Sequence, residues 1–169
     1  LGGAIPLGGE IMVDTRRLDK IVSINPTDAV ATVQAGMNGA EFERALNNAG
    51  FTCGHLPQSI EISTVGGWLA CRGGGQLSSR YGKIEDIVNG LDVVLANGHT
   101  ITTGGSPRAA VGPDLTQLFV GSEGTLGVIT GARLRLHPAP RVEQRAAFGF
   151  SSFGDGIDAC RRVMRRGAT

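Results

Sequence analysis

The sequence is poor in aromatic residues and in cysteine, and neither sign of charge is in excess. Aromatic residues make up 5% of the 169 residues, and the three cysteines Cys53, Cys71 and Cys160 form no C-x-x-C pair. An odd number of scattered cysteines indicates a reducing compartment rather than a disulfide framework. Lys and Arg number 16 against 15 Asp and Glu, and this balance gives no basic surface for nucleic acid.

Long apolar runs are also absent. No stretch reaches the ~18 residues that a membrane span needs, and no apolar segment opens the chain. We therefore expect no transmembrane segment, no signal peptide and a cytoplasmic location. The histidines His55, His99 and His137 lie far apart, so we expect no metal site.

Three motifs that carry common chemistries are missing. The chain has no G-x-x-x-x-G-K-[ST] phosphate loop, no G-x-G-x-x-G after a strand and no G-x-S-x-G elbow. These absences remove support for ATP hydrolysis, a Rossmann cofactor site and α/β-hydrolase chemistry.

Glycine is abundant instead, with 27 residues of 169 against an average usage of roughly 7%. The glycines cluster at 73–75, 104–105 and 121–127 without a Gly-X-Y register, so the chain is not collagen. A hydrophobic content of 41% is enough to bury a core and excludes low-complexity disorder.

Hydrophobic periodicity predicts a mixture of strands and helices. We expect strands at 11–13, 20–24, 30–34 and 91–95. An Asn97-Gly98 hairpin turn should lead into a further strand that ends at Thr103, and two more strands are expected at 128–136 and 146–150. We expect one helix after the N-cap Asn38, a second after Ser63 or Thr64, and a third after Asp114. A fourth helix is expected over 155–166. The helices are too few for a βαβ repeat, which predicts the α+β class.

The end of the long strand suggests a domain boundary. Pro138 and Pro140 are expected to stop that strand. We place one domain at 1–140 and the start of a second at 141–169, and both ends of the chain look truncated.

In the helix after Asp114, we expect Leu115, Leu118 and Phe119 to face the core.

Two glycine-dense segments, 57–75 and 121–129, carry the functional argument. Glycine lets a ligand approach the backbone closely, and the Ser and Thr hydroxyls between the glycines supply hydrogen bonds. We expect the short helix after Thr64 to leave backbone N–H groups bare at its start. Together the segments suit a large, planar, polar cofactor; the alternative is that the glycines serve only turns and bulges.

These segments resemble a known family. The stretch 114–130, DLTQLFVGSEGTLGVIT, resembles the signature of FAD-linked oxidases of the vanillyl-alcohol oxidase and p-cresol methylhydroxylase type. Matching pieces at 63–67, 80–82 and 86–90 occur in the same order, so the resemblance covers about residues 8–140. Within the family, 55–68 is most similar to alkyldihydroxyacetonephosphate synthases.

The resemblance implies an α+β FAD-binding domain, truncated at its N-terminus, followed by the first strand and helix of a cap domain. It also implies that the cofactor is FAD and that the residues performing substrate chemistry lie beyond Thr169. A non-covalent flavin is favoured, because no Cys lies near the start of 63–67. The residues implied to contact FAD are Gln58, Ser59, Ile60, Glu61, Ile62, Ser63, Thr64, Gly66, Gly67, Cys71, Arg72, Gly73, Gly74, Glu123, Gly124, Thr125, Leu126, Gly127, Val128 and Ile129.

Several of these residues and their neighbours have plainer interpretations. Arg72 is either a cofactor contact or a surface guanidinium, and Glu123 is either a contact or a turn residue that accepts from local N–H groups. His55 either faces a substrate cavity or is satisfied by backbone carbonyls. Trp68 is expected in the core rather than stacked on a ligand.

Three functions follow from these features. The first is a synthase-type exchange of an acyl group for a long-chain alcohol; the second is FAD-dependent oxidation of a 2-hydroxy acid such as D-lactate or glycolate. The third is a scaffold domain that binds no cofactor. The expected partner is a small-molecule or lipid-like substrate, with a homodimer left open. The synthase resemblance adds a peroxisomal or peripheral-membrane location as an alternative.

Overall fold

The computed structural model describes residues 5–105 and 110–167, and it divides into two compact units, Leu1–Ala139 and Pro140–Thr169. The first unit contains β1 (Ile21–Asn25), β2 (Val30–Gln34), α1 (Gly39–Asn48), β3 (Phe51–Thr52), α2 (Val65–Ala70), α3 (Ser78–Tyr81), α4 (Ile84–Ile87), β4 (Val88–Val94), β5 (Thr100–Thr102), α5 (Leu115–Phe119), β6 (Val128–Arg135) and β7 (His137–Pro138). The second unit contains α6 (Phe153–Arg165). The α+β class predicted from the sequence is confirmed.

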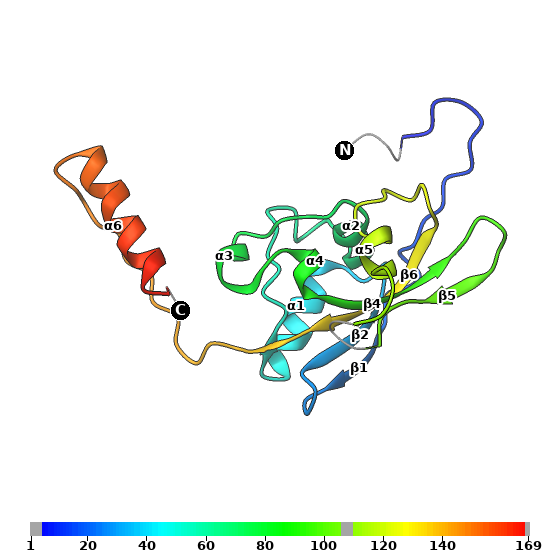
Figure 1. Ribbon diagram of the computed structural model, residues 1–169, viewed down its shortest axis with the longest axis horizontal. Helices are drawn as coiled ribbons and strands as arrows, with labels where there is room; N and C mark the ends of the chain where they lie inside the picture. Colours follow the sequence, from blue (N-terminus) through cyan, green and yellow to red (C-terminus); the bar gives the residue numbers. More distant parts are fainter. Residues whose placement is uncertain (1–4, 106–109, 168–169) are drawn as a thin grey trace. The chain divides into compact units, whose positions relative to one another are not determined.

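The first unit is built on a five-stranded antiparallel sheet with the order β1-β2-β6-β4-β5 (Figure 1). The β1–β2 hairpin turns where the Asn25 side chain accepts from the Thr27 and Asp28 amides. The β4–β5 hairpin turns at Asn97-Gly98 as predicted, with Gly98 at φ +82°. β6 pairs with both β2 and β4, so the last long strand lies in the centre of the sheet.

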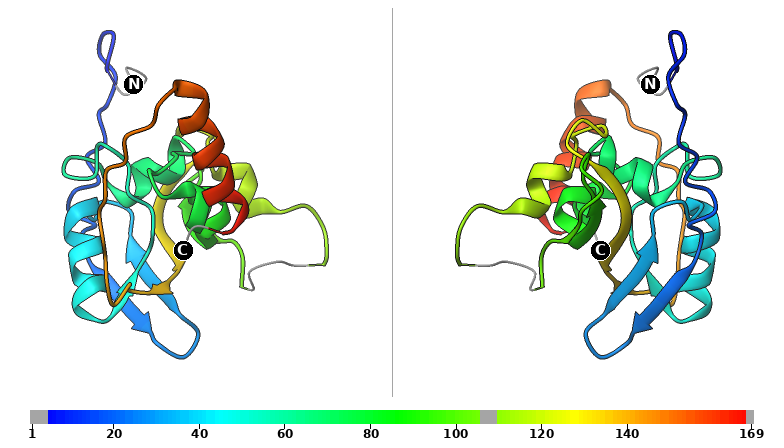
Figure 2. Two further views of the ribbon diagram at one scale, coloured as in Figure 1. Left: turned by 90° about the vertical axis from the view of Figure 1, so that its left-hand side faces the viewer. Right: turned by 90° about the vertical axis from the view of Figure 1, so that its right-hand side faces the viewer.

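The core lies between this sheet and the helices α1 and α2. Phe42 and Leu46 of α1 are fully buried, as is Leu69 of α2, and they pack with alternate residues of the central strands. Burying each such side chain stabilises the fold by about 1.5–3 kcal/mol. Figure 2 shows these helices and the sheet from two sides.

The predicted helix caps are confirmed. The Asn38 side chain accepts from the Ala40 and Glu41 amides at the start of α1. Thr64 caps α2 through the Gly67 amide, and Asp114 caps α5 through the Gln117 amide. Each cap satisfies an amide that the first helical turn leaves without an intrahelical partner.

Two predicted strands are wrong. Residues 11–13 and 146–150 are coil in the structure, and all of them are exposed. Apolar sequence alone does not make a strand, because a strand also needs a neighbour to pair with. Neither segment pairs with a strand in the described parts of the chain.

Two details around the sheet also differ from expectation. In α5, the Leu115 and Leu118 side chains are 49% and 55% exposed, while Thr116 and Phe119 are buried. A helix of five residues has no sustained apolar stripe, so tertiary contacts decide its inner face. The long strand β6 does end before Pro138, as predicted, but strand pairing resumes at once, since Pro138 pairs with Phe51 in the small β3–β7 sheet.

The second unit consists of an extended coil and α6. Ser152 caps the helix by accepting from the Asp155 amide, and the Asp158 carboxylate pairs with Arg161 and Arg162. No residue of α6 is buried. The boundary between the units lies within one residue of the predicted one, and the assignment of residues 141–169 to a cap domain stays a prediction. None of the helices in residues 5–105 and 110–167 is both long and apolar enough to cross a membrane.

Candidate cofactor site

The fold brings the two glycine-dense segments together. The Gly121 amide donates to the Leu69 carbonyl (2.9 Å), and the Glu123 amide donates to the Ala70 carbonyl (3.0 Å). The loop from α5 to β6 is thereby tied to the C-terminal end of α2. Gly127 allows the far end of this loop to lie against β4, since a Cβ there would come within 2.8 Å of Val93.

The start of the first segment is anchored on α1. The Gly39 and Ala40 amides donate to the Ser63 and Ile60 carbonyls, at 2.9 and 3.1 Å. The Asn38 side-chain amide also donates to the Glu61 carbonyl at 2.8 Å. Residues 60–63 therefore present their side chains from a loop whose backbone is fixed at three points.

The expectation that α2 starts with bare N–H groups is wrong. The Val65 amide donates to the Met37 carbonyl at 3.0 Å, and the Gly66 amide donates to the Ala35 carbonyl at 2.7 Å. A Cβ on Gly66 would also come within 2.7 Å of Ala35. Gly66 thus serves the close packing of α2 on the β2–α1 connection, and these amides are not open to a ligand.

Trp68 belongs to the core, as predicted. Its side chain is buried, and the indole N–H donates to the Ser63 hydroxyl oxygen at 2.8 Å. The ring also packs so tightly on α1 that a Cβ on Gly39 would lie 2.3 Å from it. Trp68 therefore supports the loop that carries the candidate residues and does not itself face a ligand.

Two non-glycine residues at the joint have left-handed backbone conformations. Arg72 has φ +51° and Glu123 has φ +50°, a region that L-residues adopt at a cost of about 1–2 kcal/mol. Both side chains are exposed. The Glu123 carboxylate makes no hydrogen bond to a described residue, contrary to the turn-residue alternative, whereas the Arg72 guanidinium donates to Gln117 Oε1 at 2.8 Å.

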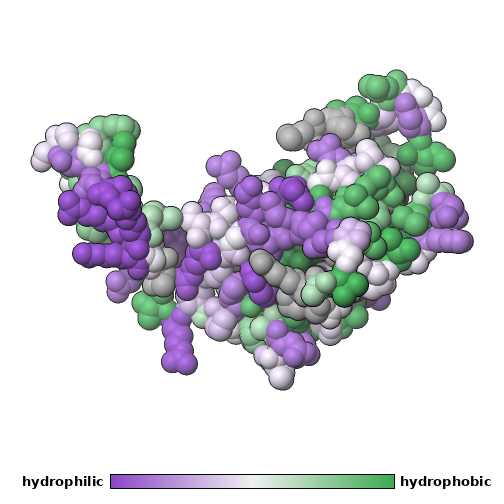
Figure 3. Space-filling model, viewed as in Figure 1, coloured by the Kyte–Doolittle hydropathy of each residue, from purple (hydrophilic) through white to green (hydrophobic). Residues whose placement is uncertain are grey.

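Most of the residues expected at FAD lie on the surface. Gly73 is half-buried, and Ile129 is buried within β6. Three large apolar side chains are exposed among the candidates: Ile62 at 86%, Leu126 at 44% and Val128 at 40%. Figure 3 shows apolar surface over the loop that joins α5 to β6. The exposed candidates are Gln58, Ser59, Glu61, Ile62, Gly67, Cys71, Arg72, Gly74, Glu123, Gly124, Thr125, Leu126 and Val128.

His55 lies beneath the Gly73–Gly75 run and is fully buried. Its ring is 4.7 Å from that of Trp68, and a Cβ on Gly75 would lie 3.3 Å from Nδ1. Neither ring nitrogen has a hydrogen-bond partner among the described residues, so the alternative of satisfaction by carbonyls is wrong. Burial lowers the pKa of His55 to about 4, against an opposing effect of the Glu85 charge. The imidazole is therefore neutral near neutral pH.

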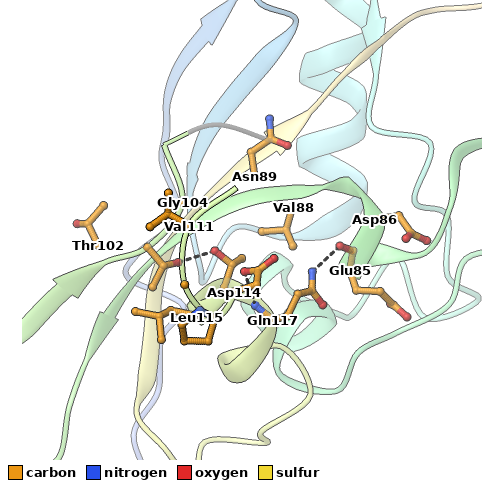
Figure 4. A pocket seen from close by; sticks show the side chains of 14 residues that line it. Glu85, Asp86, Val88, Asn89, Thr102, Gly104, Val111, Asp114, Leu115 and Gln117 are labelled. Atoms are coloured by element: carbon orange, nitrogen blue, oxygen red, sulfur yellow. Dashed lines mark hydrogen bonds between the residues drawn. The ribbon is translucent and has the colours of Figure 1, made fainter. Parts of the chain in front are cut away.

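A cavity of about 460 Å³ opens beside β4 and α5, with Asn89, Asp114 and Gln117 in its lining (Figure 4). None of the residues expected at FAD lines it. The candidate cofactor surface is therefore the open face formed by the two joined segments. In the described ranges no group of His, Cys, Asp and Glu could hold a metal ion.

The residues of this face fit a flavin cofactor. A Cβ on Gly74 or Gly124 would meet nothing within 4 Å, so a ligand can approach the backbone closely at both positions. The exposed apolar side chains suit an aromatic ring system, and the neighbouring hydroxyl, amide and guanidinium groups suit its polar edge and phosphates.

Comparison with known proteins agrees with this fit. The model of a family described as FAD binding domain matches residues 1–104. This chain belongs to the FAD binding domain family. FAD is therefore the cofactor of this domain, and the match covers 58–74 but ends before 121–129.

Curated proteins similar to this chain extend the likeness over most of its length. It is 42% identical over 153 residues to the alkyldihydroxyacetonephosphate synthase of Caenorhabditis elegans, covering 90% of this chain and 26% of the synthase. It is 40% identical over 144 residues to the glycolate oxidase subunit GlcD of Bacillus subtilis, covering 85% of this chain and 31% of that subunit. A solved structure of alkyldihydroxyacetonephosphate synthase superposes with a TM-score of 0.76 at 32% identity, covering 90% of this chain and 27% of that one.

The FAD binding domain described here thus spans about a quarter to a third of the length of these curated relatives. The fold class and the resemblance to FAD-linked oxidases near the synthases are confirmed. Sequence reasoning missed Gln117, which contacts Arg72 across 45 positions of the chain. No local pattern signals this role, because the contact joins residues that are far apart in the sequence.

Proposed function

We propose that this chain is the flavin-binding part of an FAD-dependent enzyme of the alkyldihydroxyacetonephosphate synthase type. The 42% identity to the Caenorhabditis elegans synthase carries this proposal. In the proposed reaction a long-chain alcohol replaces the acyloxy group of an acylated phosphate substrate, which leaves as a carboxylic acid, without net redox change. Because the chain covers 26% of that synthase, we expect the 169 residues alone to be inactive.

We assign the cofactor contacts to the two joined segments. In this proposal Ile62, Leu126 and Val128 cover the apolar part of the flavin, and the open backbone at Gly74 and Gly124 admits its polar edge. Arg72 faces the anionic diphosphate arm. The bound flavin would supply the reactive ring for the exchange, while these residues bind it, orient it and exclude water from one side.

The linkage to FAD is proposed to be non-covalent. Cys53 is buried and burial raises its pKa to about 12, so it supplies no thiolate, and no cysteine lies at the start of residues 63–67. Denaturing the full-length protein should release all of its yellow flavin into the supernatant. Flavin that stays with the precipitated polypeptide would contradict the assignment.

The second candidate function is oxidation of a 2-hydroxy acid. The 40% identity to the glycolate oxidase subunit GlcD favours it. The two functions separate in one assay on the full-length protein under anaerobic conditions. Bleaching of the flavin by D-lactate or glycolate would exclude the synthase reaction, and a flavin that keeps its colour with both acids supports it.

The site assignment has its own test. Arg72→Ala and Gly124→Val in the full-length protein should both lower flavin occupancy, the second because a branched side chain blocks the open backbone. Gly98→Val is the matched control, since Gly98 has the same φ of +82° and nothing within 4 Å of its Cβ position but lies in the β4–β5 turn. Unchanged occupancy in both site variants would remove the assignment. Full-length protein that contains no flavin and takes up none would leave the scaffold function instead.

A further inference from the structure

The Gln117 carboxamide joins three elements around the cofactor face. Its Nε2 donates to the Glu85 carbonyl of α4 at 2.8 Å, and its Oε1 accepts from Arg72 after α2 at 2.8 Å. Gln117 itself belongs to α5, where Asp114 caps its backbone amide. Figure 4 shows the Gln117 side chain reaching to the backbone of Glu85.

These contacts fix which way the carboxamide points. A backbone carbonyl only accepts hydrogen bonds, so the NH2 group must face Glu85 and the oxygen must face Arg72. Gln117 is half-buried and held at its backbone as well as at both ends of its side chain. The oxygen is therefore a fixed acceptor for the guanidinium and does not depend on a flexible surface side chain.

Arg72 depends on this acceptor. Its backbone is left-handed, and Gly121 approaches so closely that a Cβ there would lie 3.1 Å from the Arg72 Cβ. The guanidinium is exposed and pairs with no carboxylate in the described parts of the chain. A neutral oxygen orients the cation without cancelling its charge, and the contact uses one of its five N–H donors.

We propose that Gln117 is a positioning residue for the cofactor, holding the Arg72 guanidinium so that its free N–H donors meet the diphosphate of FAD. The inference rests on the proposed function, in which Arg72 faces that diphosphate. It adds that a residue of α5, outside the two glycine-dense segments, sets the affinity for FAD through Arg72.

A double-mutant cycle on full-length apoprotein tests the proposal. Gln117→Met keeps the length and packing of the side chain and removes both hydrogen bonds. It should weaken binding of FAD, measured by quenching of flavin fluorescence, by about 5- to 10-fold. In an Arg72→Ala background the same change should alter the dissociation constant less than about twofold. Binding of ADP, which shares the diphosphate, should weaken by the same factor as binding of FAD.

The controls separate positioning from folding. Asn47→Ala removes a carboxamide whose side chain bonds only within α1, and it should leave the FAD affinity unchanged. The melting temperature of each apoprotein reports folding. An equal loss of affinity in the Arg72→Ala background would show a structural role and overturn the proposal, as would weakened FAD with unchanged ADP. If Gln117→Met binds FAD like the parent, this proposal fails while the proposed function stands. If the parent protein binds neither FAD nor ADP, both fail.

Discussion

At the scale of single residues, the structure places left-handed backbone and a buried, unpaired histidine next to the cofactor face. Arg72 and Glu123 hold left-handed conformations at the joint of the two segments, and His55 lies unpaired beneath Gly73–Gly75. Such features cost stability in the folded protein, and they persist because the surrounding contacts hold them in place. Both kinds of cost can be measured.

Replacing Glu123 by glycine should stabilise the apoprotein. Glycine adopts a φ of +50° without the penalty of a Cβ, so the gain should be about 1 kcal/mol in the free energy of unfolding. Glu123→Ala removes the same carboxylate but keeps the Cβ, and it serves as the control. Urea unfolding of the two variants decides the matter, and an alanine variant as stable as the glycine variant would refute the argument.

His55 should make the fold sensitive to acid. Its pKa is about 4 in the folded protein and about 6.5 in an unfolded chain, so the unfolded state binds more protons between these values. Its contribution to stability is full above about pH 6.5 and is lost as the pH falls towards 4, by up to about 3 kcal/mol. Unfolding free energies of the parent and of His55→Gln, compared at about pH 7 and pH 4.5, should show a smaller pH dependence in the variant. His99→Gln, in the exposed β4–β5 turn, is the control substitution.

Residue-scale features differ in how far the sequence predicts them. The caps Asn38, Thr64 and Asp114 are correctly predicted, because a cap bonds amides two or three positions away. The Gln117–Arg72 contact is not predictable in this way, since it joins residues 45 positions apart. The burial of His55 likewise depends on Trp68 and on the glycine run that folds over it.

At the scale of secondary-structure elements, α2 is the piece that links the sheet to the cofactor face. Its first amides bond to the β2–α1 connection, and its last carbonyls bond to the loop before β6. The strands at β1, β2, β4 and β6 are predictable because apolar residues there, alternating in β2 and β6, meet paired neighbours. Residues 11–13 have the same apolar character but pair with no described strand, so the strand predicted there does not form.

The packing of α2 predicts a sharp difference between two glycines. A methyl group on Gly66 would meet the Cβ and carbonyl of Ala35 at 2.7 and 2.9 Å, whereas one on Gly74 would meet nothing within 4 Å. Gly66→Ala should therefore destabilise the apoprotein by about 1–3 kcal/mol. Gly74→Ala should change the unfolding free energy by less than about 0.5 kcal/mol. Chemical denaturation of both variants checks this, and equal effects would contradict the packing argument.

At the scale of the whole molecule, the chain consists of two units of very different character. The first has a continuous buried core, while α6 of the second buries none of its residues. Between Arg141 and Phe150 every residue is exposed and none belongs to a helix or strand. The sequence indicated this boundary through Pro138 and Pro140, since proline donates no backbone hydrogen bond.

The exposed connection should be an early site of proteolysis in the 169-residue chain. Trypsin should cut after Arg141 and Arg145 before it cuts within the strands of the five-stranded sheet, because cleavage needs an unfolded segment of backbone. Mass spectrometry of a brief digest gives the order of the cuts. Early products that end within the five-stranded sheet would show that the first unit is less stable than its core suggests.

The central place of β6 has a consequence for synthesis of the protein. β2 and β4 precede β6 along the chain, yet both of their inner edges pair with it. Until a ribosome has released residues 128–135, these two strands have open edges and nothing between them. A nascent or prematurely terminated chain that lacks β6 therefore exposes two unpaired strand edges at once, and such edges can pair with other chains. Such products should recruit chaperones or aggregate, and mutations that stall translation just before Val128 should be more harmful than those that stall it after Arg135.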